Sequence, residues 1–182
     1  MRIVLVSLYD GFNFAIRVLK TVLSDYDVRL IFFKQDYIEE KSTDKEVKDL
    51  AYQINSQHPD IVGFTLRSAF YPEFKRIAPL INSRIIVGGQ HPTICPEDFK
   101  DYADTICIGE GEDVIRDIIE GKKGIVYGGF VKDVNTIPSP VTSNMKKMSV
   151  ITARGCFFNC VTTRCRKKSS RVGMSEGVTP TM

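Results

Sequence analysis

Short apolar runs alternate with amphipathic segments along the first 127 residues, and this alternation limits the folds open to the chain. Runs rich in Val, Ile and Phe suit strands buried on both faces, and apolar residues at helical spacing between the runs predict helices. Strands separated by helices form a parallel sheet covered on both faces, so we predict a flavodoxin-like or Rossmann-like doubly wound α/β fold. The expected strands are Ile3–Val6, Val28–Phe33, Ile61–Thr65, Arg84–Val87, Thr105–Ile108 and Ile125–Tyr127.

Local signals mark the helices expected between these strands. Apolar residues recur at helical spacing from Phe12 to Leu23. One face of a last helix is lined by Val114, Ile115, Ile118 and Ile119. Thr43 and Glu46 have the spacing of a capping box, in which each satisfies a backbone N–H of the other at the start of a helix. The helix expected from Pro72 should end or bend early at Pro79, because proline disrupts a helix interior.

Bulk composition and charge distribution narrow the class of protein. Hydrophobic residues make up 43% and charged residues 26%, as in globular proteins. No apolar run approaches the ~20 residues that span a bilayer. The start of the chain lacks the features of a signal peptide, so a cytoplasmic location is the default expectation. The net charge is +3, but residues 161–182 carry five Lys or Arg against one acidic residue, a net of +4, which leaves −1 for residues 1–160. A basic nucleic-acid-binding face is therefore not indicated.

Glycine-rich and polar segments follow three of the expected strands. In doubly wound folds the ligand lies beyond the carboxyl ends of the strands. Paired glycines there let a large ligand approach the backbone, although a tight turn with positive φ is the alternative explanation. Two such loops at one sheet edge favour a binding site. The candidate cofactor-binding residues are Thr65, Leu66, Arg67, Gly88, Gly89, Gln90, His91, Gly109, Glu110 and Gly111.

For several serine, histidine and cysteine residues, a purely structural role remains an open alternative to a role in ligand binding. Ser68 can cap a helix, and His91, which precedes a proline, is more often a structural hydrogen-bond donor to a loop carbonyl. His58 suits a surface turn. Cys95 and Cys107 stand alone in or beside apolar segments, which is typical of buried, inert thiols. The chain has no P-loop motif, and no Gly-x-Gly-x-x-Gly follows the first strand, so a dinucleotide site is disfavoured.

Three of the five cysteines lie within ten residues of one another. An odd number of cysteines makes a disulfide framework unlikely in a cytosolic chain. Cys156 and Cys160 come directly after an expected strand at 149–152, where two thiolates can bind two irons of one cluster. Zinc or free thiols are the alternatives, but zinc usually recruits a second cysteine pair or histidines, and none is near.

The segment Thr-Ala-Arg-Gly-Cys-Phe-Phe-Asn-Cys, residues 152–160, resembles the start of the radical S-adenosylmethionine signature. The preceding domain resembles the cobalamin-binding domain of one large branch of that family, with matches at residues 88–93, 109–112 and 137–140. The resemblance implies a bound cobalamin, and in the full-length parent a 4Fe–4S cluster that binds S-adenosylmethionine. The implied reaction is methyl transfer or another radical step. The implied cluster ligands are Cys156, Cys160 and Cys165.

The sequence departs from that family in three places. The family spacing of Cys-x-x-x-Cys-x-x-Cys puts the third cysteine at Thr163, whereas Cys165 lies two residues later. Only 22 residues follow Cys160, and a TIM-type barrel needs about 200. Cobalamin proteins that supply a histidine to cobalt carry Asp-x-His-x-x-Gly after the first strand, but here Phe12 and Ala15 stand in the His and Gly places of a motif that begins at Asp10.

We therefore expect four segments: a cobalamin-binding α/β domain at 1–128, a linker at 129–148, the start of a radical S-adenosylmethionine domain at 149–160, and a disordered or frameshifted tail at 161–182. By itself this chain should bind cobalamin weakly and show no turnover. The competing hypotheses are a flavodoxin-like binding or regulatory module with incidental cysteines, and a flavin or nucleotide-sugar enzyme that uses the same strand-end cleft.

Overall fold

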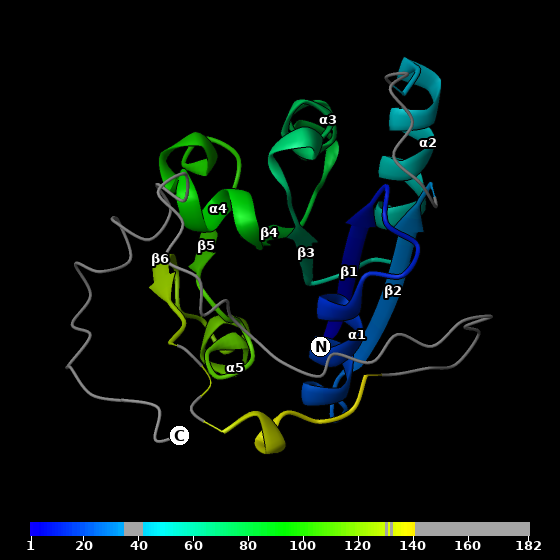
Figure 1. The fold of residues 1–182 in the computed structure, drawn as a ribbon. Coiled ribbons are helices and arrows are strands. Elements are labelled where there is room, and N and C mark those ends of the chain that lie inside the picture. Colours follow the sequence, from blue (N-terminus) through cyan, green and yellow to red (C-terminus); the bar gives the residue numbers. More distant parts are fainter. Residues whose placement is uncertain (35–41, 130, 132, 141–182) are drawn as a thin grey trace. The chain divides into compact units, whose positions relative to one another are not determined.

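The computed structural model describes residues 1–34, 42–129, 131 and 133–140. Its centre is one six-stranded sheet in which every neighbouring pair of strands is parallel, in the order β2-β1-β3-β4-β5-β6 (Figure 1). The predicted α/β class and all six expected strands are confirmed. The strands are β1 Arg2–Leu8, β2 Asp27–Phe33, β3 Ile61–Thr65, β4 Arg84–Gly88, β5 Thr105–Ile108 and β6 Gly124–Tyr127.

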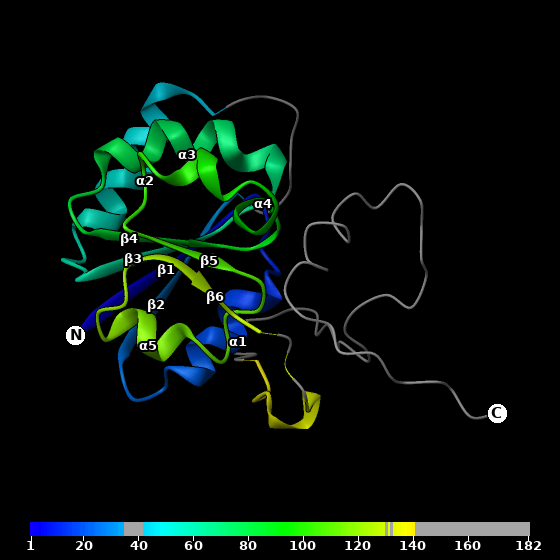
Figure 2. The ribbon, with the colours of Figure 1, turned by 90° about the vertical axis from the view of Figure 1, so that its left-hand side faces the viewer.

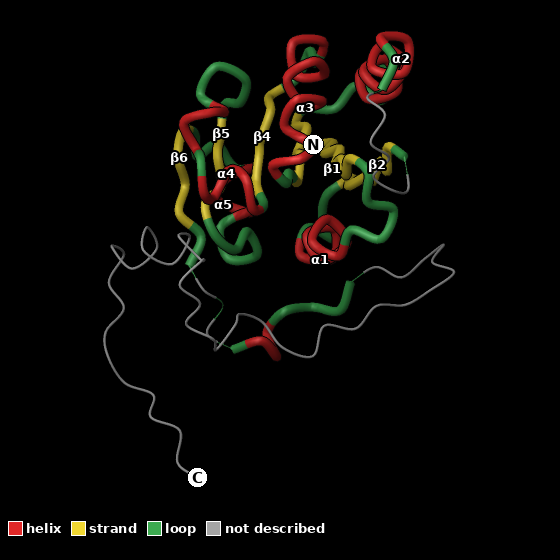
Figure 3. Tube along the Cα trace, turned by 45° about the horizontal axis from the view of Figure 1, so that its top comes forward, coloured by secondary structure: helices red, strands yellow, loops and turns green. Residues whose placement is uncertain are grey.

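Helices connect the successive strands and cover both faces of the sheet. Figure 2 shows α2 and α3 on one side of the sheet and α1 and α5 on the other, and Figure 3 shows the strands in yellow among the red helices. The α-helices are α1 Phe14–Val22, α2 Asp44–Asn55, α3 Tyr71–Ile77, α4 Gln90–Ile94 and α5 Ile115–Ile119. The 3-10 helices are η1 Ser68–Phe70, η2 Ala78–Leu80, η3 Pro96–Phe99 and η4 Val134–Thr136.

Strand residues of alternating position build two separate apolar layers. Successive side chains of a strand point to opposite faces. Val4 and Val6 of β1 therefore pack with α2 and α3, while Ile3 and Leu5 pack with α1 and α5. Each fully buried side chain of this size contributes roughly 1.5–3 kcal/mol to folding. The layers hold the strand ends, and thus the loops beyond them, in fixed relative positions.

The expected local signals mostly act as predicted. Thr43 Oγ1 accepts from the Glu46 N–H at 3.2 Å, and Glu46 Oε2 accepts from the Thr43 N–H at 2.8 Å, which completes the capping box of α2. Pro79 lies in η2, where α3 has already ended. The first helix begins at Phe14 and not at Phe12, because Asn13 is its N-cap and accepts from the Ile16 N–H at 3.2 Å.

One helix was missed by the sequence patterns. Residues 90–94 form α4, where a simple loop was expected after the fourth strand. A five-residue helix with a proline inside it is too short to show helical periodicity. It packs against β5 and η3, and these tertiary contacts stabilise it.

Among the described residues, no helix is both long and apolar enough to cross a membrane. The expected strand at 149–152 and the predicted tail at 161–182 lie outside the described residues.

Candidate functional site

The loops that follow β1, β3, β4 and β5 start at the same edge of the sheet. The register pairs Ser7 of β1 with Thr65 of β3, and Thr65 with Gly88 of β4. Parallel strands in register end together, so their carboxyl-terminal loops are neighbours in space. The three segments that hold the ten candidate residues therefore begin at one edge.

The strand order places a topological switch point between β1 and β3. The chain moves from β1 outward to β2 and then returns to β3 on the other side of β1. The connection after β1 leads to α1 on one face, and the connection after β3 leads to α3 on the opposite face (Figure 2). Open α/β sheets bind ligands in the crevice that this divergence opens.

Asp10 and Arg67 face each other across the switch point. The Arg67 Nη2 atom lies 3.9 Å from Asp10 Oδ2, and the Arg67 side chain is 62% exposed. An ion pair of this length and exposure contributes little to stability. The guanidinium therefore keeps most of its hydrogen-bonding capacity for a ligand at the sheet edge.

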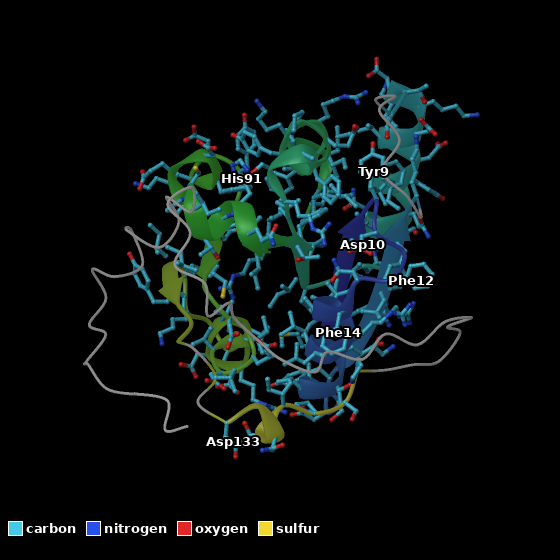
Figure 4. All side chains as sticks on the ribbon, in the orientation of Figure 1. Tyr9, Asp10, Phe12, Phe14, His91 and Asp133 are labelled. Atoms are coloured by element: carbon cyan, nitrogen blue, oxygen red, sulfur yellow. The ribbon has the colours of Figure 1, made fainter. Side chains whose placement is uncertain are left out.

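The loop between β1 and α1 is held by its own hydrogen bonds. Asp10 Oδ1 accepts from the Phe12 N–H at 3.1 Å, and the Ser7 hydroxyl donates to the Asp10 carbonyl at 2.9 Å. These bonds leave the Phe12 ring 43% exposed, and Figure 4 shows Asp10, Phe12 and Phe14 together near the start of α1. The exposed ring is an apolar surface beside the switch point.

A buried tyrosine ties this loop to the helices on the α2–α3 face. Tyr9, at φ 55°, packs its ring against Phe70 and donates its hydroxyl proton to Glu73 Oε2 at 3.0 Å. Ser42 Oγ lies 2.5 Å from the same hydroxyl. Burial, followed by the neighbouring carboxylate, raises the pKa of Tyr9 above its ordinary value, so the hydroxyl stays protonated at neutral pH.

Gly89 lies where a side chain would not fit. Its φ is 105°, and a Cβ atom there would lie 2.9 Å from the Leu66 carbonyl oxygen and 3.0 Å from the Leu66 nitrogen. The Leu66 N–H donates to the Gly88 carbonyl at 2.8 Å, and the His91 N–H donates to the Leu66 carbonyl at 3.1 Å. The turn explanation for this glycine is thus confirmed, and the turn brings the β3 and β4 loops together.

One threonine hydroxyl joins the two glycine-rich loops. Thr93 Oγ1 donates to the Gly89 carbonyl at 2.7 Å and accepts from the Gly109 N–H at 3.0 Å. Gly109 has φ 85°, and a Cβ atom there would collide with the Gly128 carbonyl oxygen at 2.4 Å. Glu110 Oε2 accepts from the Val131 N–H at 2.6 Å. The β4 and β5 loops therefore form one surface made largely of main chain.

The remaining candidate residues differ in how they are presented. The Leu66 side chain is 1% exposed, so only the position of its backbone can serve a ligand site. Gln90 and Gly109 are exposed, and Gly111 lies against Cys107 and Leu19. The Ser68 side chain caps neither η1 nor α3, so the capping explanation for it is wrong.

His91 points away from the sheet edge. The residue is 8% exposed, and its ring is stacked on Tyr71 at 4.9 Å between centroids and meets Phe99 edge-on at 5.1 Å. Figure 4 shows it at the α3–α4 side of the molecule, well separated from Phe12. Nε2 pairs with Asp98 Oδ2 at 2.8 Å, so the expected partner, a loop carbonyl, is replaced by a carboxylate.

The predictions for His58 and Cys107 are confirmed, whereas the prediction for Cys95 is wrong. His58 is exposed with φ 48°, as expected for a surface turn. Cys107 is buried, and burial raises the pKa of its thiol to about 11, which confirms an inert thiol. Cys95 is exposed, so the prediction that it is buried is wrong. It follows a helix of only five residues that the sequence pattern did not reveal. The predicted cluster ligands Cys156, Cys160 and Cys165 lie outside the described residues.

Comparison with known proteins identifies the family to which the chain belongs. The model of the B12 binding domain family matches residues 2–119, which is more than half of the chain, so the chain belongs to that family. An uncharacterized methyltransferase of Pyrococcus horikoshii is 29% identical over 178 aligned residues. The alignment covers 77% of this chain and 37% of that relative, so the chain spans little more than a third of the relative's length. No solved structure gives a significant match.

The residues at the strand ends fit a cobalamin. The corrin is a broad, flat macrocycle with amide side chains, and a phosphodiester links it to its lower nucleotide. Glycine main chain at Gly89 and Gly109 allows close approach, the exposed Phe12 ring offers an apolar contact, and the Arg67 guanidinium suits a phosphate oxygen. The His91 ring is packed against Tyr71 and Phe99, and His58 precedes β3 at the opposite end of that strand, so neither imidazole is presented at this edge.

Proposed function

We propose that this chain binds cobalamin over the β1, β3, β4 and β5 loops, and that it is the cobalamin-binding part of a radical S-adenosylmethionine methyltransferase. The observation that carries the first statement is the family match over residues 2–119, which contains the switch point and both glycine-rich loops. The proposed site residues are Thr65, Leu66, Arg67, Gly88, Gly89, Gln90, His91, Gly109, Glu110 and Gly111.

These residues would act in different ways. Thr65, Arg67 and Gln90 would offer polar side chains at the edge, whereas the glycines would offer main chain. Leu66 and His91 would hold the two loops together through the hydrogen bond from His91 N–H to the Leu66 carbonyl. When bound, cobalamin supplies methyl transfer or radical chemistry, and the protein contributes position, orientation and protection from water.

The cobalt would receive no imidazole from this chain. Phe12 stands in the place where histidine-donating cobalamin proteins carry their ligand, and His91 is closed in by Tyr71 and Phe99. His58 precedes β3 and so lies toward its amino end, away from the binding edge. We therefore expect the electron paramagnetic resonance spectrum of bound cob(II)alamin to lack nitrogen splitting from a protein histidine.

Binding is tested by equilibrium dialysis of the purified chain against hydroxocobalamin, with FMN as the competing cofactor class. Saturable cobalamin binding without FMN binding supports the proposal. Arg67→Ala should weaken binding about tenfold, which is about 1.4 kcal/mol and within the range of one charge-assisted hydrogen bond. Arg29→Ala is the matched control, because Arg29 is also exposed and, within the described part of the chain, pairs with Asp27 on the same strand. Preference for FMN would instead favour the flavin alternative.

The second statement is supported by the resemblance of residues 152–160 to the radical S-adenosylmethionine signature and by a relative named as a methyltransferase. We propose that Cys156, Cys160 and Cys165 are cluster ligands, with the 4Fe–4S cluster and S-adenosylmethionine acting in the full-length parent. Anaerobic reconstitution with iron and sulfide tests this. Iron bound by the chain should fall when Cys156 and Cys160 are replaced by serine, and unchanged iron would contradict the assignment.

A further inference from the structure

His91, Cys95 and Asp98 bring an imidazole, a thiol and a carboxylate together at the corner between α4 and η3. One ligand atom of each residue lies within 4.8 Å of the other two. His91 and Cys95 are four residues apart, so they lie on the same side of one helical turn, and the Cys95 N–H donates to the His91 carbonyl at 2.8 Å. Asp98 reaches the same place from η3.

His91 is the fixed member of this group. Its ring is stacked on Tyr71 and meets Phe99 edge-on, which leaves the residue 8% exposed. Cys95 and Asp98, in contrast, are exposed to solvent. The group thus combines one rigid anchor with two side chains that can move at the surface.

The imidazole has an unsatisfied nitrogen. Nδ1 is buried and has no hydrogen-bond partner within the described part of the chain. When Nε2 carries the ring proton and donates it to Asp98, Nδ1 is left as a buried lone pair. Buried polar atoms almost always have a partner, and a neutral imidazole is the commonest metal ligand in proteins. Nε2 is the nitrogen that faces Asp98, so an ion held by both residues would replace the hydrogen bond between Nε2 and Asp98 Oδ2, with the ring proton on Nδ1.

We propose that His91, Cys95 and Asp98 form a binding site for a divalent cation of the zinc type. A mixed nitrogen, sulfur and oxygen set suits Zn²⁺, whereas Mg²⁺ and Ca²⁺ prefer oxygen ligands alone. Bonds of about 2.0–2.3 Å in a tetrahedral site put ligand atoms about 3.3–3.7 Å apart. The pair formed by His91 Nε2 and Asp98 Oδ2, now 2.8 Å apart, would have to open slightly, and ligand atoms up to 4.8 Å apart would have to close by about 1 Å. The exposed Cys95 and Asp98 side chains can make these shifts.

The bound ion would fasten α4 to η3. The α4 helix begins directly after Gly89, so the site adjoins the glycine-rich β4 loop. This site shares no metal ligand with the cysteines at 156–165, and it requires no bound cobalamin. Metal binding at this site and cobalamin binding at the sheet edge can therefore be measured separately in the same samples.

The test uses the full-length chain with Cys156, Cys160 and Cys165 replaced by serine, which leaves Cys95 and Cys107 as the thiols. Anaerobic titration with Co²⁺, a spectroscopic substitute for zinc, should saturate at one ion per chain with a thiolate-to-cobalt charge-transfer band, and Zn²⁺ should displace it. Cys107 will not contribute, because it is buried and the pKa of its thiol is about 11. Absence of the band in this background overturns the proposal.

Two variants identify the ligands. Cys95→Ser should abolish the charge-transfer band, and Asp98→Asn should weaken Co²⁺ binding about tenfold or more, since even loss of an outer-shell partner costs 10- to 100-fold. Glu97→Gln is the matched control, because the neighbouring exposed carboxylate pairs with Lys100 and lies outside the group. Both substituted ligands are exposed, so folding should be retained. A band that persists in Cys95→Ser, or equal weakening by Glu97→Gln, also overturns the proposal.

Discussion

Replacing Gly89 by alanine should destabilise the domain by about 2–4 kcal/mol. The backbone at this position, φ 105° and ψ −162°, lies in a region essentially restricted to glycine, which costs a side-chain-bearing residue about 1–3 kcal/mol. The added Cβ would also lie 2.9 Å and 3.0 Å from backbone atoms of Leu66, and overpacking of that kind costs about 1–3 kcal/mol. The smaller entropy of the unfolded alanine chain offsets roughly 0.4–1 kcal/mol.

Urea denaturation followed by circular dichroism measures this effect. With a slope of about 2 kcal/mol per molar urea, the midpoint should fall by about 1–2 M. Gly129→Ala is the control, because a Cβ at Gly129 meets nothing within 4 Å and φ there is not in the left-handed region. The control should stay within about 0.5 kcal/mol of the wild type. A Gly89→Ala midpoint equal to that of the control would refute the reasoning.

Three further outcomes are expected. Phe74→Ala should cost about 3–5 kcal/mol in urea denaturation, because this ring is fully buried, and a loss below 1 kcal/mol would contradict the packing. Native alkylation at pH 8, read by peptide mass spectrometry, should label Cys95 but not Cys107, whose thiol pKa of about 11 leaves about one thiolate in a thousand. The Thr43 backbone N–H, followed by Lys34, lowers the pKa of Glu46 to about 2, so this carboxylate stabilises the fold above pH 4.5 and loses its effect as the pH falls toward 2. The stability advantage of wild type over Glu46→Gln should shrink in that window, and a constant difference would contradict it.

The sheet was predictable because its signals are local. Ile61–Thr65 and Thr105–Ile108 are short apolar runs between helical patterns, and their strands have the predicted boundaries. The capping box at Thr43 and Glu46 needs only four consecutive residues to form. Such features depend on residues close in sequence, so a single sequence contains the information they need.

The candidate site was less predictable because its details depend on contacts across the sheet. The sequence analysis identified Gly88 and Gly89 as candidate residues. It did not predict that the Thr93 hydroxyl contacts both glycine-rich loops, because that contact exists only when β4 and β5 are neighbours in the sheet. The pairing of His91 with Asp98, seven residues later, depends on α4, which no periodicity revealed. The sequence did contain the spacing of His91, Cys95 and Asp98. This spacing indicates that the three side chains lie close together only if residues 90–94 are known to form a helix.

The proposed cobalamin-binding edge is built mainly from main chain at Gly89 and Gly109, with Thr93 as the hydroxyl between them. Catalytic triads and metal centres are often found with structural templates that match sets of side chains. Such templates would not detect a site of this kind. Backbone torsion angles at two strand ends, together with one bridging hydroxyl, would make a better template. Such a template would tolerate wide divergence in the surrounding sequence and would be sensitive to the insertion of a single Cβ atom.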